Sequence, residues 1–232
     1  MLDMEKKEFI QHEKRWVYRL LMLIAGFYGG YAMLVRGGAF SNAQTGNIIL
    51  LMMSLGKGEL GKAAYYVIPF AAYLSGTVLS ELLVTRNRVV GRLRWGTMLI
   101  VLELLMVALM GFIPATAPHQ ICQIIINVIC AMQFNTFREA EGVPITTTFC
   151  TNNVRLMGVY MAGLFRKDND KKEQRSKLLF YTEMVAYFAL GVLISTVACR
   201  VVSTYAIWLL LVPLSVLSVS LLHADLKDKI SV

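Results

Sequence analysis

The sequence predicts an all-helical, polytopic membrane protein, and three observations support this: composition, the length of the apolar runs, and where the charges lie. Of the 232 residues 56% are hydrophobic, and the mean hydropathy is +0.57, well above an ordinary soluble domain. Several runs approach the roughly 20 apolar residues that a membrane-spanning helix needs. The net charge of +8 comes largely from basic residues in the loops between these runs, as the positive-inside rule predicts. We therefore attribute the charge to membrane orientation and not to nucleic-acid binding.

Six runs are long enough to be full spans. In chain order they lie at about 16–35, 63–84, 95–113, 121–137, 178–199 and 205–222. The first begins with Trp16 and Tyr18, which suit an interfacial position. Two loops are strongly basic, namely residues 166–177 and the loop that contains Arg86, Arg88, Arg92 and Arg94. We expect one membrane domain over residues 1–232, in a bacterial inner membrane, with the tails 1–15 and 223–232 in the cytoplasm.

Two further apolar segments, at 41–54 and 148–164, are shorter than a span. Each follows a loop that contains Gly or Pro. The uninterrupted apolar part of the first, residues 48–53, would be about 9 Å long at a rise of about 1.5 Å per residue. A matched pair of short, interrupted segments is a signature of the binding site in two-repeat transporters and channels.

The two halves of the chain resemble each other, which predicts an internal duplication. Thr45 and Thr151 are 106 residues apart, as are Gly29 and Asn135. Beyond the longer second loop the separation becomes 115, and five identical pairs follow: Lys62/Lys177, Tyr66/Tyr181, Ala71/Ala186, Gly76/Gly191 and Ser80/Ser195. The first repeat would cover about 16–113 and the second about 120–222.

The number of spans depends on the two short segments. If both are re-entrant, there are six full spans and the repeats are inverted; seven or eight spans result if one or both cross fully, and with eight the repeats are parallel. Six spans place the four-arginine loop inside and the connector 115–119, which has no Lys or Arg, outside. The positive-inside rule favours this arrangement. Re-entrant segments also require protein or a water-filled cavity around their unwound backbone.

In the six-span arrangement the two half-helices enter from opposite faces, and their N-termini meet near the midplane. We expect Thr45 and Thr151 to be the N-caps, with free backbone N–H groups and positive helix ends that attract anions or carboxylates. Gly46 would permit close approach of the backbone. Amide donors and acceptors would come from Asn47, Asn152 and Asn153. The alternative is that these residues are ordinary caps in a packed bundle.

Several polar side chains inside the apolar segments extend the candidate site. Arg155 would lie at membrane depth, where a charge costs at least about 2.5 kcal/mol. It either binds an anionic substrate, pairs with Glu103 or Glu183, or snorkels to an interface. Glu103 and Glu183 are the candidate proton-coupling carboxylates, with an interfacial position as the alternative for Glu183. Gln133 and Asn135 either line the cavity or hydrogen-bond between helices.

The sequence contains no recognisable catalytic or metal-binding motif. His12, His119 and His223 lie outside the spans, and the four cysteines have irregular spacing that fits neither a zinc site nor a disulfide framework. We therefore expect neither an enzyme nor a bound metal or cofactor. The expected partners are the lipid bilayer and a small solute, and the sequence leaves a homo-oligomer open.

Four short motifs, in a fixed order, carry a family resemblance. They are GGAF at 37–40, TGN at 45–47, AMQFN at 131–135 and TTFCT at 147–151. With these motifs the chain resembles, over nearly its whole length, the YoaK family of bacterial membrane proteins of unknown function. The resemblance implies an integral protein of the bacterial inner membrane and leaves the substrate open.

These observations predict a membrane transporter or channel for a small polar or anionic solute. Its midplane site would lie at the N-termini of two half-helices. The alternative is a non-transporting membrane partner or sensor, in which the short segments only pack against the bundle.

Overall fold

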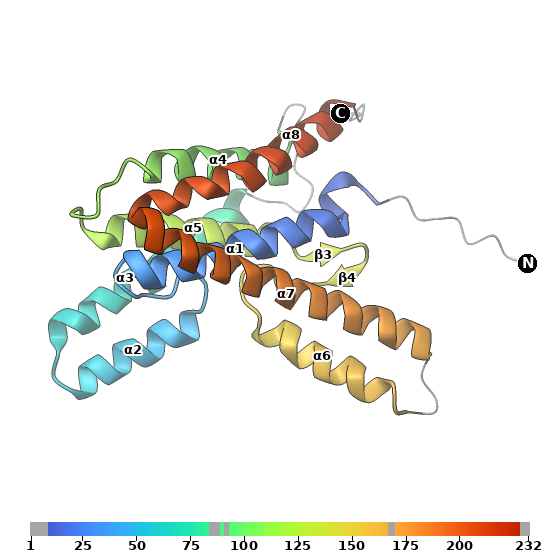
Figure 1. Ribbon diagram of the computed structural model, residues 1–232, viewed down its shortest axis with the longest axis horizontal. Helices are drawn as coiled ribbons and strands as arrows, with labels where there is room; N and C mark the ends of the chain where they lie inside the picture. The colour runs from blue at the N-terminus through green and yellow to red at the C-terminus, as the bar shows by residue number, and fades with distance from the viewer. Residues whose placement is uncertain (1–8, 84–88, 91–92, 167–169, 228–232) are drawn as a thin grey trace, which may run out of the picture.

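The computed structural model describes residues 9–83, 89–90, 93–166 and 170–227, and these form a largely helical protein (Figure 1). Three residues of the four-arginine loop, Arg86, Arg88 and Arg92, lie outside the described residues, as do positions 167–169 of the second basic loop. The elements are η1 (Gln11–Glu13), α1 (Arg15–Val35), α2 (Gln44–Gly56), α3 (Leu60–Leu83), β1 (Val89–Val90), β2 (Leu93–Arg94), α4 (Trp95–Met110), α5 (His119–Thr136), β3 (Glu139–Ala140), β4 (Val143–Pro144), α6 (Thr151–Gly163), α7 (Lys171–Val202), η2 (Ser203–Leu210) and α8 (Leu211–Lys227).

The helices have the length and composition of membrane spans. Three helical stretches are long and apolar enough to cross a bilayer: Arg15–Val35, Leu60–Leu83, and Lys171–Lys227, which runs through α7, η2 and α8. Trp95–Met110 is a shorter apolar helix. The protein is thus a helical membrane protein, as predicted. The predicted spans and helices differ mainly at the ends, since α7 begins at Lys171 and α8 continues into the predicted C-terminal tail.

Helices α1 and α7 pack closely because small residues let their backbones approach. A Cβ atom at Gly26 would lie 2.0 Å from the carbonyl oxygen of Phe188, and one at Gly191 would lie 2.0 Å from that of Leu23. Real Cβ atoms do not approach oxygen so closely, so a larger residue at either position would push the helices apart.

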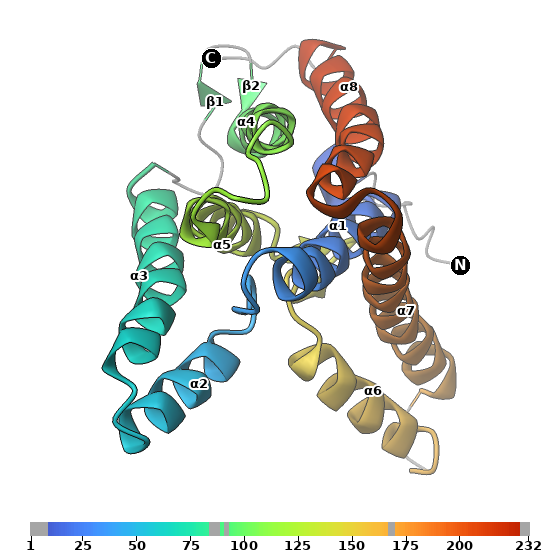
Figure 2. The ribbon, with the colours of Figure 1, turned by 60° about the vertical axis from the view of Figure 1, so that its left-hand side comes forward.

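Helices α3 and α5 form a second close pair (Figure 2). A Cβ atom at Gly76 would lie 2.7 Å from the carbonyl oxygen of Val128. Near the C-terminal ends of the two helices, Asn135 Nδ2 donates to Ser80 Oγ at 3.1 Å. The two helices therefore run in the same direction and end together.

Helices α4 and α8 pack against each other on one side of α1 and α5 (Figure 2). The close approach at Gly111, where a Cβ would overlap the indole of Trp208, ties the end of α4 to η2. In the middle of this layer, the Tyr28 hydroxyl of α1 donates to Glu103 Oε1 of α4 at 2.9 Å. A polar contact thus joins the α4–α8 layer to the rest of the bundle.

Contacts at the two ends of the molecule show that α1 and α4 run in the same direction. Just before α1, His12 Nε2 lies 2.8 Å from Thr97 Oγ1 in the first turn of α4. Just after α1, Arg36 Nη2 donates to the carbonyl oxygen of Ile113, beyond the end of α4, at 2.8 Å. Both helices therefore begin at the His12 end of the molecule and finish at the Arg36 end.

Candidate functional site

The two short helices converge in the middle of the molecule. Each has 13 residues, which is about 20 Å of helix against the roughly 30 Å of a bilayer's hydrocarbon core. In both views their N-terminal ends lie near each other beside α1, and the helices then diverge, with α2 running toward the end where α1 finishes and α6 toward the end where α1 begins (Figures 1 and 2). The residues at the starts of the two short helices are therefore brought close together in the structure (Figures 1 and 2).

Asn47 holds the connector that leads into α2. The side chain is fully buried, its Oδ1 accepts the backbone N–H of Phe40 at 2.9 Å, and its Nδ2 donates to the Phe40 carbonyl oxygen at 2.8 Å. Gln44 Oε1 accepts a further hydrogen bond from the same Nδ2 at 3.0 Å. The amide therefore fixes the backbone that precedes the helix and has little capacity left for a solute.

Asn153 occupies the matching position at the start of α6. It too is fully buried, and its Nδ2 donates to the carbonyl oxygen of Thr146 at 2.9 Å. Phe40 and Thr146 both lie seven residues before their asparagine. The two sites differ in one respect, because Asn153 Oδ1 has no hydrogen-bond partner among the described residues.

The predicted N-caps are wrong. The N-cap of α2 is Ala43 and that of α6 is Cys150, and neither forms a side-chain capping bond. Thr45 is the second residue of α2 and Thr151 the first of α6, and both are exposed at the converging ends. The capping prediction failed because each helix begins before or at its threonine, and backbone carbonyl oxygens accept from first-turn N–H groups: Ala43 from Gly46 and Asn47, and Cys150 from Val154.

Gly46 packs closely against an aromatic ring. A Cβ atom at this position would lie 2.6 Å from two carbon atoms of the Phe40 ring. Phe40 is also the residue that Asn47 holds through its backbone. Gly46 therefore serves the packing of the connector against the first turn of α2.

Arg155 lies on the exposed side of α6. Its Nε and Nη2 atoms donate to Asn152 Oδ1 at 3.1 and 3.0 Å. In the described structure Arg155 does not form an ion pair with Glu103 or Glu183, which was one of the predicted alternatives. The guanidinium is instead held on the surface of its own helix, one turn from the converging ends.

Glu183 belongs to an ion-pair cluster at the start of α1. Its Oε2 lies 2.5 Å from Arg15 Nη2, and its Oε1 lies 2.6 Å from Arg19 Nε. Since Arg15 is the first residue of α1, this geometry favours a position of Glu183 at the membrane interface over a role in proton coupling.

Glu103 is the carboxyl group at the interior of the helix bundle. It is fully buried, and the Tyr28 hydroxyl donates to its Oε1. Its Oε2 has no hydrogen-bond partner within the part of the chain that the structure describes. A buried carboxyl with a spare oxygen can exchange a proton once water or a solute reaches it, so Glu103 remains the better candidate for proton coupling.

The two predicted polar residues of α5 have different surroundings. Gln133 is fully buried, and both its Oε1 and Nε2 lack a partner among the described residues. Asn135 is half-buried and bonds Ser80 of α3, while Arg138 donates to its carbonyl oxygen and side chain. Asn135 therefore links α3 and α5 at their ends, whereas Gln133 is available to a ligand.

Three buried hydroxyl residues near the converging ends were not predicted as site residues. Ser41 precedes α2, and Thr147 and Thr148 precede α6. These residues are at most 1% exposed; the hydroxyls of Ser41 and Thr147 lack a hydrogen-bond partner among the described residues, and that of Thr148 lies beside the hydroxyl of Tyr73 in α3. Their position in the two connectors could have indicated them, because polar side chains next to irregular backbone inside an apolar protein are candidate site residues.

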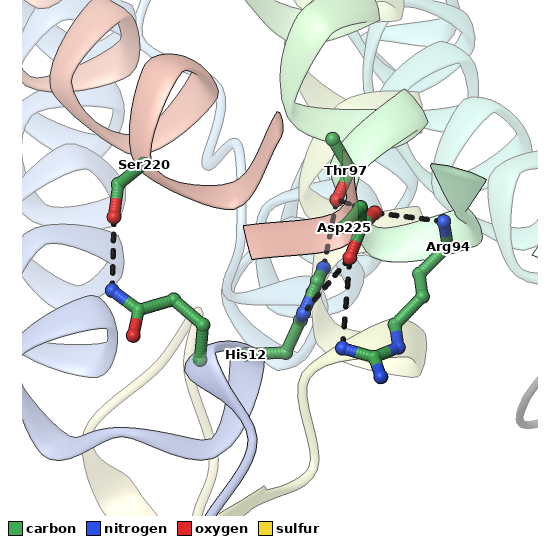
Figure 3. Close-up of polar contacts among 6 residues, drawn as sticks. His12, Arg94, Thr97, Ser220 and Asp225 are labelled. Atoms are coloured by element: carbon green, nitrogen blue, oxygen red, sulfur yellow. Dashed lines mark hydrogen bonds and ion pairs between the residues drawn. The ribbon is translucent and has the colours of Figure 1, made fainter. Parts of the chain in front are cut away.

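A second buried polar cluster lies at the His12 end of the molecule (Figure 3). Asp225 Oδ2 accepts the backbone N–H of Arg94 at 2.8 Å and the Thr97 hydroxyl at 2.6 Å, while its Oδ1 faces Arg94 Nη1 at 3.5 Å and His12 Nδ1 at 3.9 Å. Because the single hydroxyl hydrogen of Thr97 goes to the carboxylate, His12 Nε2 is the donor in its contact with Thr97. The cluster joins η1, α4 and α8, and sequence reasoning missed it because His12 and Asp225 fall in the predicted tails.

Comparison with known proteins identifies the family. The model of the family described as "Protein of unknown function (DUF1275)" matches residues 17–220. The chain matches no curated protein and no solved structure. Since the family match covers most of the sequence, the chain belongs to the DUF1275 family, the YoaK-like family that its motifs resemble.

Proposed function

We propose that this protein is a transporter or channel for a small polar or anionic solute, in a bacterial inner membrane with both termini in the cytoplasm. The solute site lies between the first turns of α2 and α6. The observation that carries the proposal is the convergence of these two N-terminal ends inside a membrane protein (Figures 1 and 2). Irregular backbone at membrane depth is tolerated where it lines a polar site, and paired half-helices form such sites in transporters.

The directions of the helices support six full spans and two re-entrant segments. With six spans, α1, α3 and α4 alternate, so α1 and α4 are parallel. If α2 also crossed the membrane, α1 and α4 would be antiparallel. The contacts of His12 with Thr97 and of Arg36 with Ile113 favour the parallel arrangement.

Matching contacts in the two halves support the internal repeat. Gly76 of α3 meets the backbone of α5, and its counterpart Gly191 of α7 meets the backbone of α1. Likewise, Asn47 and Asn153 hold backbone carbonyl oxygens seven residues upstream. Each repeat thus packs its third helix against the first helix of the other repeat, which is the pattern expected of an intertwined, inverted pair.

Reconstitution in liposomes tests the transport proposal. Stopped-flow light scattering would measure the entry of a panel of small solutes, namely erythritol, urea, acetate and glycolate, against liposomes without protein. We expect at least one solute to enter faster through the protein. Thr45→Val and Thr151→Val, which remove the exposed hydroxyls at the converging ends, should slow that solute about tenfold.

The control is Thr182→Val, since Thr182 donates only to the carbonyl oxygen of Leu178 within its own helix. It should leave the flux unchanged, and all three variants should keep the melting temperature of the wild type. If no solute enters faster than into empty liposomes, or if the Thr45 and Thr151 variants transport normally, the proposed site is wrong. Stable co-purification with another membrane protein would then support the partner or sensor alternative.

A further inference from the structure

We infer that the solute is uncharged and carries hydroxyl or amide groups, and that the hydroxyls of Ser41, Thr147 and Thr148 bind it together with Asn153 Oδ1. The inference rests on the proposed transport function and assigns the class of its substrate. It adds side chains of the two buried connectors to the contacts that the exposed Thr45 and Thr151 make.

The two connectors contain buried polar atoms with unsatisfied hydrogen-bonding capacity. Ser41 Oγ, Thr147 Oγ1 and Asn153 Oδ1 lack a partner among the described residues, Thr148 Oγ1 lies beside the hydroxyl of Tyr73, and all four connector residues are at most 1% exposed. A buried polar group without a partner costs about 1–3 kcal/mol. Native proteins rarely leave such groups without a hydrogen-bond partner, and polar sites of this kind normally hold water or a ligand.

The hydroxyls of Ser41 and Thr147 occupy equivalent places in the two halves of the chain. Ser41 and Thr147 each lie six residues before the buried asparagine of their half, Asn47 or Asn153. Both connectors lead to the ends where α2 and α6 converge (Figure 2). Each half therefore brings one buried hydroxyl to the connector that leads to the converging ends.

Beside the connectors no buried cationic side chain is left unbound in the part of the chain that the structure describes. Among the described residues the buried charged side chains other than His12 are Arg36, Glu103 and Asp225. Arg36 is bound to the Tyr31 hydroxyl and to the carbonyl oxygens of Ile113 and Pro114 at the end of the molecule. The remaining two are acidic. An anion in this region would lose its hydration without a compensating positive side chain.

The helix ends do not supply that compensation in full. The backbone N–H groups of Gly46 and Asn47 both donate to the Ala43 carbonyl oxygen, and that of Val154 donates to Cys150. The guanidinium of Arg155 is exposed and bonded to Asn152. Hydroxyl and amide groups, which act as both donors and acceptors, suit an uncharged solute better than an anion.

The test uses the full-length protein in proteoliposomes, with erythritol and urea as uncharged probes and acetate and glycolate as anions of similar size. We expect accelerated entry of an uncharged probe, and entry of the anions at the rate of empty liposomes. Thr147→Val and Thr148→Val keep the side-chain shape and remove the hydroxyl. Each should slow the uncharged probe at least fivefold.

The matched control is Thr196→Val, because Thr196 donates to the carbonyl oxygen of Val192 in its own helix. It should leave the flux unchanged. Melting temperatures give a readout that does not depend on transport. Thr147 Oγ1 has no partner among the described residues, so Thr147→Val should leave the melting temperature unchanged or raise it, and a marked fall would contradict the inference.

The outcomes separate the inference from the function on which it rests. Accelerated entry of an anion that Arg155→Gln abolishes would overturn the substrate class and leave transport intact. Accelerated entry of an uncharged probe that is insensitive to Thr147→Val and Thr148→Val would overturn the assigned contacts. If neither class of probe enters faster than into empty liposomes, the transport function itself fails, and the inference fails with it.

Discussion

Asn47 gives the clearest prediction at the scale of single residues. Its buried amide makes three hydrogen bonds, two of them to the backbone of Phe40. Asn47→Ala would leave these backbone groups without partners, which should lower the free energy of unfolding by about 3 kcal/mol. Thermal melting in detergent would measure the change. Asn152→Ala is the control, because that half-buried amide bonds side chains only, namely the exposed Arg155 and, at 3.4 Å, Thr146 Oγ1; equal losses for the two variants would refute the role given to Asn47.

Asp225 carries a second prediction at this scale. Its carboxylate is 1% exposed and is held by Arg94 and Thr97. Asp225→Asn removes the charge that faces the partly exposed Arg94 guanidinium and turns one acceptor of the cluster into a donor, and a buried polar group left unpaired costs about 1–3 kcal/mol. The variant should therefore melt well below the wild type. Glu81→Gln, in the exposed pair with Arg138, should show no measurable change; similar melting of both variants would mean that the Asp225 cluster adds nothing to stability.

These residues also show where sequence reasoning stopped. The sequence offers Asn47 and Asn153 alike as solute ligands, because it does not say which groups an amide faces. In the structure both amide atoms of Asn47 bond Phe40, whereas Asn153 Oδ1 has no partner among the described residues. Thr147 and Thr148 belong to a motif that the sequence shows, but the burial of their hydroxyls is a three-dimensional property. His12 and Asp225 are more than 200 positions apart, and no local pattern predicts their contact.

At the scale of the helices, the close pairing of α1 and α7 is open to a direct test. A Cβ atom at Gly191 would lie 2.0 Å from the backbone oxygen of Leu23. Gly191→Ala should therefore force the helices apart and cost about 3 kcal/mol, the upper range for overpacking. Gly158→Ala is the matched control, because within the described residues no atom lies within 4 Å of its added Cβ. That variant should be neutral or slightly stabilising in the same melting measurement; a loss as large as that of Gly191→Ala would contradict the close packing.

The helices themselves were largely predictable, whereas their partners were not. Hydropathy along the chain located six long helices and two short ones, since the thickness of the bilayer sets the length of apolar sequence that a spanning helix needs. It does not say which helix packs against which. The pairing of α1 with α7 and of α3 with α5 depends on small residues whose spacing in a single sequence suits many partners. Helix ends were also uncertain, because α7 and α8 continue into polar sequence.

At the scale of the whole molecule, the proposed symmetry explains why the halves depend on each other. The third helix of each half, α3 or α7, packs chiefly against the first helix of the other half, α5 or α1. Neither half can bury its small-residue face alone. This interlocking also places the start of each short helix beside the shared centre, so a site formed there belongs to both halves.

The membrane topology gives a prediction that does not depend on which end of the protein faces the cytoplasm. Lys57 follows α2 and Arg166 follows α6, and both are exposed. If the short helices are re-entrant from opposite faces, cysteines at these two positions lie on opposite sides of the membrane. If both short helices cross fully, the same two positions lie on one side.

An impermeant thiol reagent on intact cells would distinguish these cases, in a background without the native cysteines Cys122, Cys130, Cys150 and Cys199. We expect one of Lys57→Cys and Arg166→Cys to be labelled at once and the other only after permeabilisation. The positive-inside rule assigns the protected position to Arg166, next to the basic start of α7. Labelling of both positions from the same side would exclude inverted repeats, and the converging ends of α2 and α6 would then no longer mark a midplane site.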